Sequence, residues 1–365
     1  MKRITLFFSL CLLCTILGAQ TPKGVKIKYT DATQLTLFGQ LFPDNPNPYW
    51  RVDPSRFPGL DKTEQGQVRC TPGKAVLFKT NSTIITVLPE YGLKSYGTGA
   101  TGISLRGFDL YIKKGGKWLF AEAGVGKPNK EDGNEYVIIK NMDDSMKECM
   151  LYLPMGSELK KLEIGVQEGA RIEAIQNPFR HRICIFGSSF THGASTSRSG
   201  MIYSNQLSRM TGLQFINLGC SGHSKLQSYF ADILAAADVD ALVFDAFSNP
   251  NRKQIETRLF PFIETIQKAH PDIPLIFQRT IYRESRNFTK SVDKWELEKD
   301  DLVDRLMDEA CKKYKNVYYI TCTNATDKNH ETSVDATHPG DYGYTLWAQS
   351  VAKPITKILK KYGIK

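Results

Sequence analysis

The hydrophobic pattern along the chain changes its period near residue 180. Before that point, short stretches of alternating apolar and polar residues are separated by turn-forming residues, which is typical of β-strands. Lys114-Gly115-Gly116-Lys117 has the composition of a hairpin turn. No convincing amphipathic helix intervenes, so we expect a β-sandwich, jelly-roll-like, over residues 20–178. The expected strands cover residues 25–37, 75–79, 83–88, 108–113, 117–121, 135–140, 149–153, 162–166 and 171–175, with long loops at 42–58 and 91–107.

After residue 180, short apolar runs alternate with segments of helical length. This alternation predicts a parallel sheet with helices on both faces. Five strands suit a flavodoxin-like, three-layer α/β domain over residues 179–365, whose ligand site would lie at the carboxyl ends of the strands. The expected strands are 182–186, 214–218, 241–247, 273–277 and 317–320, and the expected helices are 201–210, 225–237, 253–270, 295–313 and 342–362.

The first nineteen residues have the layout of a secretory signal peptide. Lys2 and Arg3 precede an apolar run from Ile4 to Leu17, and Gly18-Ala19 supplies the small residues of a cleavage site. A lipoprotein signal would need a small residue before its cysteine, which neither Cys11 nor Cys14 has. We therefore expect cleavage near Ala19 and export to the periplasm or the extracellular space.

Composition narrows the possible partners. The chain carries a net charge of +10, but its C-terminal lysines recur at helical spacing, as on the solvated face of a helix. No nucleic-acid motif is present, and no later apolar run is long enough to span a membrane. The six cysteines after the signal have no zinc or redox spacing, and Cys184 lies in an apolar strand pattern. We therefore expect that the protein binds no nucleic acid, metal or cofactor and does not insert stably into a membrane. The sequence leaves the cysteine pairing and the oligomeric state open.

Candidate chemistry lies directly after the expected strands. Gly187-Ser188-Ser189 follows the first strand of the second half, and Asp335-Ala336-Thr337-His338 follows the last. A serine hydroxyl is a weak nucleophile that needs an adjacent base. The spacing of Asp335 and His338 lets the carboxylate hold one imidazole nitrogen while the other faces Ser189. Ser189, Asp335 and His338 are therefore the candidate catalytic residues.

An attacked ester develops an oxyanion, which needs hydrogen-bond donors aimed at it. Gly222, in a turn after the second strand, can present a backbone N–H, and Asn249, after the third strand, offers a side-chain amide. The N–H of Ser189 would be a third donor. The alternative is that Ser189 is a helix N-cap and that Gly222 and Asn249 are ordinary turn formers.

The four segments that contain Ser189, Gly222, Asn249 and His338 resemble the sequence blocks of the SGNH (GDSL-like) hydrolase superfamily, and the likeness covers residues 181–363. Ser189, Gly222, Asn249 and His338 match the residues that give the superfamily its name, and Asp335 matches the acid of its final Asp-x-x-His. The first block departs from Gly-Asp-Ser at Ser188, where local hydrogen bonding is expected to differ. The third block lacks the usual Gly-x-Asn-Asp form.

The N-terminal half resembles the β-sandwich domain that precedes this catalytic domain in some secreted bacterial esterases. The likeness rests on residues 47–51, 106–111 and 162–166. We expect this domain to pack against the catalytic domain and to help form the substrate cleft. Candidate substrate-binding residues are Tyr91, Tyr96 and Arg106 of the Gly-rich stretch, with His192 and His223 at the pocket or its rim.

The resemblance implies a serine esterase that deacetylates acylated carbohydrate through a Ser-His-Asp triad. A lipid esterase or thioesterase is one alternative and would need a long apolar groove. The other is a carbohydrate-binding protein with an inactive hydrolase domain, against which the full Ser-Gly-Asn-Asp-His set argues. The polysaccharide and the acyl position stay open.

Overall fold

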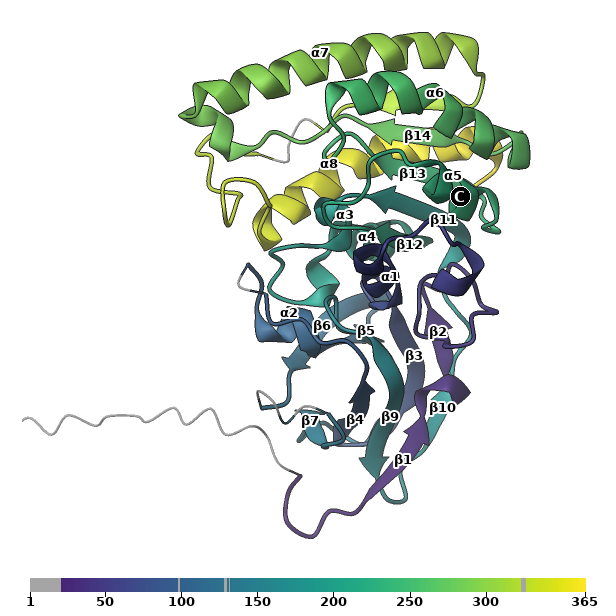
Figure 1. Ribbon diagram of the computed structural model, residues 1–365. Coiled ribbons are helices and arrows are strands. Elements are labelled where there is room, and N and C mark those ends of the chain that lie inside the picture. The colour runs from purple at the N-terminus through teal and green to yellow at the C-terminus, as the bar shows by residue number, and fades with distance from the viewer. Residues whose placement is uncertain (1–20, 98, 128–129, 131, 323–325) are drawn as a thin grey trace, which may run out of the picture.

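The computed structural model describes residues 21–365 apart from 98, 128–129, 131 and 323–325. The expected signal peptide lies outside the described residues. Figure 1 shows an elongated molecule in which a β-rich half, coloured purple to teal, adjoins an α/β half, coloured teal to yellow.

The N-terminal half contains two antiparallel sheets that enclose a core. One has the strand order β1-β9-β4-β7, and the other has the order β10-β3-β8-β5-β6, with β2 paired to β3. Val76 and Phe78 of one sheet and Ile85 and Val87 of the other belong to the same buried cluster. The expected sandwich is therefore confirmed. Its strands are β1 (Ile27–Asp31), β2 (Thr36–Phe38), β3 (Ala75–Thr80), β4 (Ile85–Tyr91), β5 (Phe108–Lys114), β6 (Lys117–Gly124), β7 (Tyr136–Ile139), β8 (Lys147–Tyr152), β9 (Leu159–Gln167) and β10 (Ile172–Ala174).

The structure differs from expectation in two places in this half. The stretch expected as one strand over residues 25–37 is interrupted by a 3₁₀ turn, η1 (Ala32–Gln34), which Asp31 caps. Two short helices, α1 (Lys62–Arg69) and α2 (Gly102–Arg106), lie where we expected no helix. Helix α1 buries only Glu64 and Val68, so it has no apolar stripe for a periodicity argument to detect.

The C-terminal half is a five-stranded parallel sheet of order β12-β11-β13-β14-β15. In chain order this is 2-1-3-4-5, which confirms the flavodoxin-like arrangement. The strands are β11 (Arg180–Gly187), β12 (Leu213–Gly219), β13 (Ala241–Asp245), β14 (Leu275–Gln278) and β15 (Val317–Ile320). The helices are α3 (Ser189–His192), α4 (Tyr203–Thr211), α5 (Ser228–Ala235), α6 (Arg252–Ala269), α7 (Lys290–Lys313) and α8 (Asp341–Leu359).

Two hydrophobic cores flank this sheet, and one of them is shared with the N-terminal half. Helices α4 and α8 cover one face, and α5, α6 and α7 cover the other. The core under α5, α6 and α7 also contains five buried side chains from the segment between β2 and β3. They are Leu41, Phe42, Val52, Leu60 and Val68. The two halves are thus packed together through a continuous apolar contact, with α1 at their junction (Figure 1).

Candidate active site

The register of the parallel sheet brings three chain segments together at its carboxyl edge. Gly187, the last residue of β11, is paired with Gly219 of β12 and with Asp245 of β13. Because these three residues are in register across the sheet, the segments that follow the three strands all begin at its carboxyl edge. Ser188 caps α3 by accepting a hydrogen bond from the N–H of Phe190, and Ser189 is the first residue of that helix.

Ser189 and His338 are brought together from opposite ends of the α/β half. His338 Nε2 lies 2.8 Å from Ser189 Oγ, and His338 Nδ1 lies 2.7 Å from Asp335 Oδ2. The imidazole also packs edge-on against the ring of Phe190, at 5.5 Å between centroids. In this arrangement the carboxylate orients the imidazole, and the imidazole can accept the serine proton.

The turn that carries Asp335 and His338 is held by its own backbone. Asp335 Oδ1 accepts hydrogen bonds from the N–H groups of Thr337 and His338, at 3.0 and 2.6 Å. Burial opposes ionisation of Asp335, but these bonds and the one to the imidazole outweigh it and lower the pKa of Asp335 below its ordinary value. The carboxylate is therefore ionised at neutral pH, as an orienting acceptor should be.

Two further hydrogen bonds anchor the chain around this turn. His330 Nδ1 lies 2.6 Å from Glu284 Oε2, and the N–H of Ser285 donates to the carbonyl of Ala336 at 2.8 Å. Glu284 was not among the predicted site residues, because nothing in the local pattern relates it to residues about fifty positions away.

The candidate oxyanion donors lie in turns at the same edge. Gly222 has φ +75°, a left-handed conformation that favours glycine, and it is exposed. Asn249 is half-buried, and its Oδ1 is buried without a hydrogen-bond partner among the described residues. This oxygen can only accept, so a hydrogen bond to an oxyanion would have to come from the Nδ2 group of Asn249.

The Gly222 turn is braced by two residues of the N-terminal half. The fully buried guanidinium of Arg51 donates to the carbonyl of Gly219 at 2.8 Å and to that of Gln67 at 2.6 Å. Gln67, on α1, donates to the carbonyl of Ser221 at 2.9 Å and accepts from its N–H at 2.6 Å. Neither residue was among the predicted site residues, although Arg51 lies in a segment that carried the resemblance.

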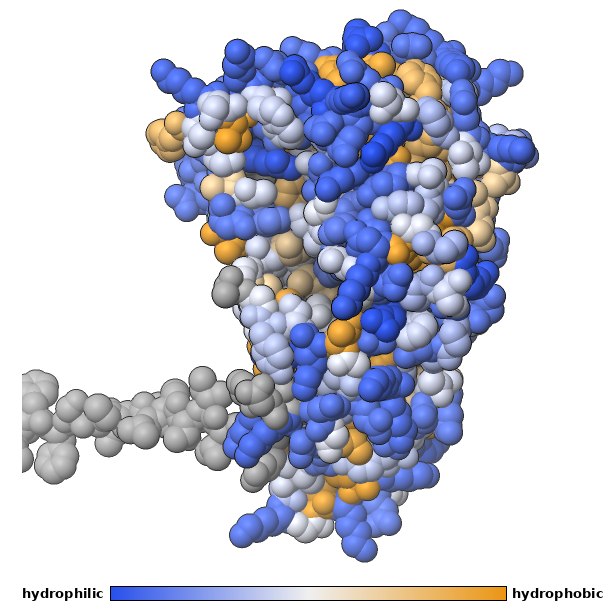
Figure 2. All heavy atoms as spheres, viewed as in Figure 1, coloured by the Kyte–Doolittle hydropathy of each residue, from blue (hydrophilic) through white to orange (hydrophobic). Residues whose placement is uncertain are grey.

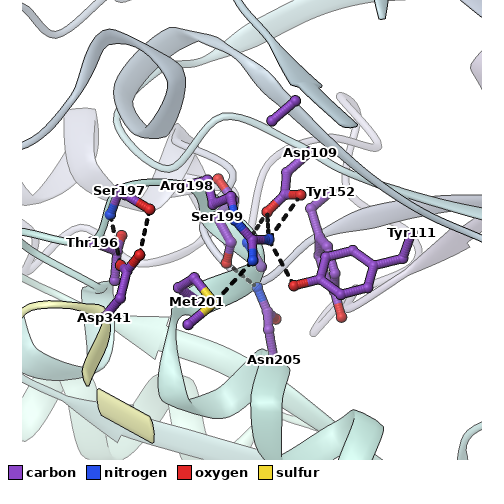
Figure 3. A network of polar contacts seen from close by, with 12 residues as sticks. Asp109, Tyr111, Tyr152, Thr196, Ser197, Arg198, Ser199, Met201, Asn205 and Asp341 are labelled. Atoms are coloured by element: carbon purple, nitrogen blue, oxygen red, sulfur yellow. Dashed lines mark hydrogen bonds and ion pairs between the residues drawn. The ribbon is translucent and has the colours of Figure 1, made fainter. Parts of the chain in front are cut away.

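A second contact between the halves holds the loop that follows α3 (Figure 3). Asp109 of β5 is paired with Arg198 at 2.9 Å and accepts from the N–H of Gly200 at 2.7 Å, and Tyr111 accepts from Arg198 at 2.7 Å. On the other side, Asp341 at the start of α8 accepts from the N–H of Ser197 at 2.8 Å. The loop is thus fixed between the β-sandwich and the helix that follows His338.

The expectations for the Gly-rich stretch need correction. Tyr91 is buried in the sandwich core and its hydroxyl donates to the carbonyl of Arg106 at 2.5 Å, so it does not face a cleft. Arg106 is also buried and donates to the carbonyl of Ser95 at 2.8 Å. Its guanidinium stacks on the half-exposed ring of Tyr96, 4.3 Å from the ring centre. Arg106 therefore shapes the loop, and of the three only Tyr96 is exposed.

His192 and His223 have different surroundings. His192 is buried, and its Nδ1 lies 3.0 Å from the carbonyl of Gly219. Burial, with a contribution from Arg51, lowers the pKa of His192 to about 3. The ring is therefore neutral at physiological pH and donates from Nδ1, so it braces the Gly222 turn from the α3 side.

His223 is partly exposed and faces α1. Its Nδ1 lies 3.4 Å from Asp61 Oδ2 and 3.3 Å from Glu64 Oε1, and these three residues form the one group among the described residues whose spacing could hold a metal ion. Glu64 already accepts from the hydroxyl of Tyr229 and from the N–H of Asp61, both at 2.8 Å. Capping of α1 thus accounts for these acidic side chains without a metal.

A pocket of about 420 Å³ lies between the N-terminal half and the loops at the sheet edge. Its lining mixes polar and apolar side chains from both halves. From the N-terminal half it includes Thr63, Gln67, Leu93, Lys94, Ser95, Leu105 and Met155, and from the other half it includes His192, Ala194 and Ser221.

No helix within the described ranges is both long and apolar enough to cross a bilayer. The face in Figure 2 is largely hydrophilic, with hydrophobic residues scattered rather than gathered. Cys70, Cys149, Cys184 and Cys220 are buried free thiols, and Cys311 is a partly exposed one.

Known proteins match both halves of the chain. Residues 180–356 match the GDSL-like Lipase/Acylhydrolase family, and residues 27–172 match the N-terminal domain of SGNH-hydrolase-type esterases. A crystal structure of a GDSL-like lipase from Bacteroides ovatus is 36% identical, with a TM-score of 0.87, over 92% of this chain and 98% of that one.

More distant structures share the fold alone. A salicylyl-acyltransferase from a tetracycline biosynthetic pathway is 18% identical, with a TM-score of 0.71, over 91% of this chain and 97% of that one. A family two carbohydrate esterase from Cellvibrio japonicus is 11% identical, with a TM-score of 0.60, over 92% and 99%. No curated protein matches the chain.

The likeness to the Bacteroides ovatus lipase extends through both halves and leaves little of either chain uncovered. Together with the two family matches, it shows that this protein belongs to the SGNH (GDSL-like) lipase/acylhydrolase family of ester hydrolases.

Proposed function

We propose that this protein is an exported serine esterase in which Ser189 is the nucleophile, His338 the general base and Asp335 the orienting acid. The observation that carries the proposal is the chain of two hydrogen bonds, 2.8 and 2.7 Å long, from Ser189 through the imidazole to Asp335. Export is supported by the signal-peptide pattern of the first nineteen residues.

The proposed reaction follows from these roles. His338 Nε2 takes the Ser189 proton as Oγ attacks the ester carbonyl, and the same proton then goes to the leaving alcohol. Water, deprotonated by His338, releases the acid from the acyl-enzyme. The backbone N–H groups of Ser189 and Gly222 and the amide of Asn249 would stabilise the oxyanion in both steps. Because base and oxyanion donors are all protein groups, we expect activity to survive treatment with EDTA.

For the substrate, we propose an O-acetylated carbohydrate and a preference for short acyl chains. The pocket of about 420 Å³ reaches Ser221, next to Gly222, and has room for a sugar-sized group, although neither Ser189 nor His338 lines it. The fold is also shared with the family two carbohydrate esterase, which gives this substrate class a precedent on the same scaffold.

The test is hydrolysis of p-nitrophenyl acetate, butyrate and octanoate, followed by acetate release from acetylated glycans. We expect the highest kcat/KM with acetate and measurable deacetylation of at least one glycan. A higher kcat/KM with octanoate would favour the lipid-esterase alternative. Binding of a glycan without hydrolysis of any ester would favour the inactive carbohydrate-binding protein.

A further inference from the structure

Asp245, the last residue of β13, is a buried carboxylate at the centre of the candidate site. It is 2% exposed, and no lysine or arginine within the described part of the chain forms an ion pair with it. A buried carboxylate without a cation is costly unless hydrogen-bond donors surround it. The donors around Asp245 come from two different turns.

One oxygen binds the turn that carries Ser189. Asp245 Oδ2 accepts from the N–H and the hydroxyl of Ser188, at 3.1 and 2.7 Å, and from the hydroxyl of Thr191 at 3.1 Å. The turn and the carboxylate are close-packed, because a Cβ atom added at Gly187 would lie 2.8 Å from Asp245 Cβ. The residues on both sides of Ser189 are therefore tied to this oxygen.

The other oxygen binds the turn that carries Asn249. Asp245 Oδ1 accepts from the hydroxyl of Ser248 at 3.0 Å, and the carbonyl of Ser248 accepts from Arg283 at 2.9 Å. The one carboxylate thus spans the gap between the proposed nucleophile and a proposed oxyanion donor.

We propose that Asp245 is a positioning residue that fixes Ser189 and Asn249 relative to each other for the esterase reaction. The inference rests on the proposed function of these two residues. Ser188, which stands where the resembled first block has aspartate, is the residue through which Asp245 reaches the turn of Ser189. Asp245 would act through Ser188 and Ser248 and would not touch the substrate.

The first test is Asp245→Asn, which keeps the shape but exchanges one acceptor oxygen for a donor group. Misplacing a reacting group by about 1 Å can cost about 10²-fold in rate. We expect kcat on p-nitrophenyl acetate to fall by about 10²-fold with KM within about threefold of wild type. The matched control is Asp53→Asn, since Asp53 is also buried and also binds a serine, Ser55, but it caps a 3₁₀ turn, Pro54–Arg56, in the segment between β2 and β3. It should keep wild-type kcat.

The second test moves the carboxylate. Asp245→Ser should lose activity, and Ser188→Asp should lose it as well, because it sets a second carboxylate against Asp245. The double variant Ser188→Asp/Asp245→Ser restores one carboxylate and the same total side-chain volume. We expect its kcat to recover at least tenfold over either single variant, which loss of structural support alone would not produce.

The outcomes separate the inference from the proposed function. If Ser189→Ala keeps its activity, the proposed function fails. If Ser189→Ala is inactive but folded Asp245→Asn has kcat within about twofold of wild type, only the positioning role fails. The same holds if the double variant is no better than the worse single variant. Should Asp245→Asn not fold, Ser248→Ala removes the Oδ1 contact alone and must still lower kcat by about tenfold.

Discussion

Gln67 and Ser221 exchange two hydrogen bonds across the junction between the two halves of the protein. The side-chain amide of Gln67, on α1, pairs with both backbone groups of Ser221, at 2.9 and 2.6 Å. Ser221 directly precedes Gly222, the proposed oxyanion donor. A residue of the β-sandwich half therefore sets the backbone position of a group in the candidate active site.

Removing this amide should slow catalysis without unfolding the protein. We expect Gln67→Ala to lower kcat by about tenfold, since the freed Gly222 N–H would lose part of an interaction of about 3–4 kcal/mol with the oxyanion. Steady-state kinetics on p-nitrophenyl acetate measures the effect. Gln65→Ala is the matched control, because Gln65 lies on the same helix but binds the carbonyl of Leu60 instead. Equal kcat in the two variants would contradict the bracing role.

The proposed nucleophile and base should act as a unit. We expect Ser189→Ala and His338→Ala each to lower kcat by at least about 10³-fold, and the double variant to be little worse than either, because triad effects are strongly non-additive. Circular dichroism should show all three folded. A folded Ser189→Ala protein with near wild-type turnover would contradict the proposal that Ser189 is the nucleophile.

The ion pair between Asp109 and Arg198 should contribute strongly to stability. Asp109 is 1% exposed and its partner Arg198 is largely buried. Asp109→Asn therefore leaves the positive charge of Arg198 without its buried counter-charge. Breaking a buried pair in this way costs about 3–5 kcal/mol. Urea unfolding gives the change in the free energy of unfolding. The comparison is Glu148→Gln, which breaks the exposed pair with Lys113 and should cost at most about 1 kcal/mol. Similar losses in both variants would argue against the buried contact.

Stability should fall in acid partly because of His192. Burial lowers the pKa of His192 in the folded protein to about 3, whereas an unfolded histidine has a pKa of about 6.5. Between these values the unfolded chain binds a proton that the folded protein does not, so stability decreases as pH falls, by up to about 1.4 kcal/mol per pH unit. His192→Asn keeps a donor for the carbonyl of Gly219 and should flatten this slope. Urea unfolding at pH 7, 6, 5 and 4 tests it, and parallel slopes in variant and wild type would refute it.

The α/β half should not be stable alone. Leu41, Phe42, Val52, Leu60 and Val68 fill one of its two cores from the N-terminal half, so residues 179–365 expressed alone would expose that apolar surface. We expect an aggregated or poorly folded product, in contrast to residues 20–365, by size-exclusion chromatography and circular dichroism. A soluble, folded fragment as active as the longer chain would show that the contact is dispensable.

Local patterns predicted the architecture of both halves. Continuous apolar runs and intervening helices fixed the order of the C-terminal elements, because strands buried on both faces leave a strong signal. The same reasoning missed α1, whose only local mark is the capping pair of Asp61 and Glu64. A short helix held by tertiary contacts has no periodic stripe to detect.

The sequence by itself determined that the Gly-Ser-Ser and Asp-x-x-His segments lie at the carboxyl edge of the sheet, because strand ends in a parallel sheet converge on one side. Only the tertiary structure revealed what holds that site together. Arg51, Gln67 and Asp245 each lie far along the chain from the backbone groups they bind, so no local spacing relates them. The tertiary structure also places Tyr91 and Arg106 in buried positions and not in the expected cleft. The sequence could not show this, because an aromatic or basic side chain can contact a protein core as well as a sugar. Burial decides between those roles, and burial is a property of the packed fold.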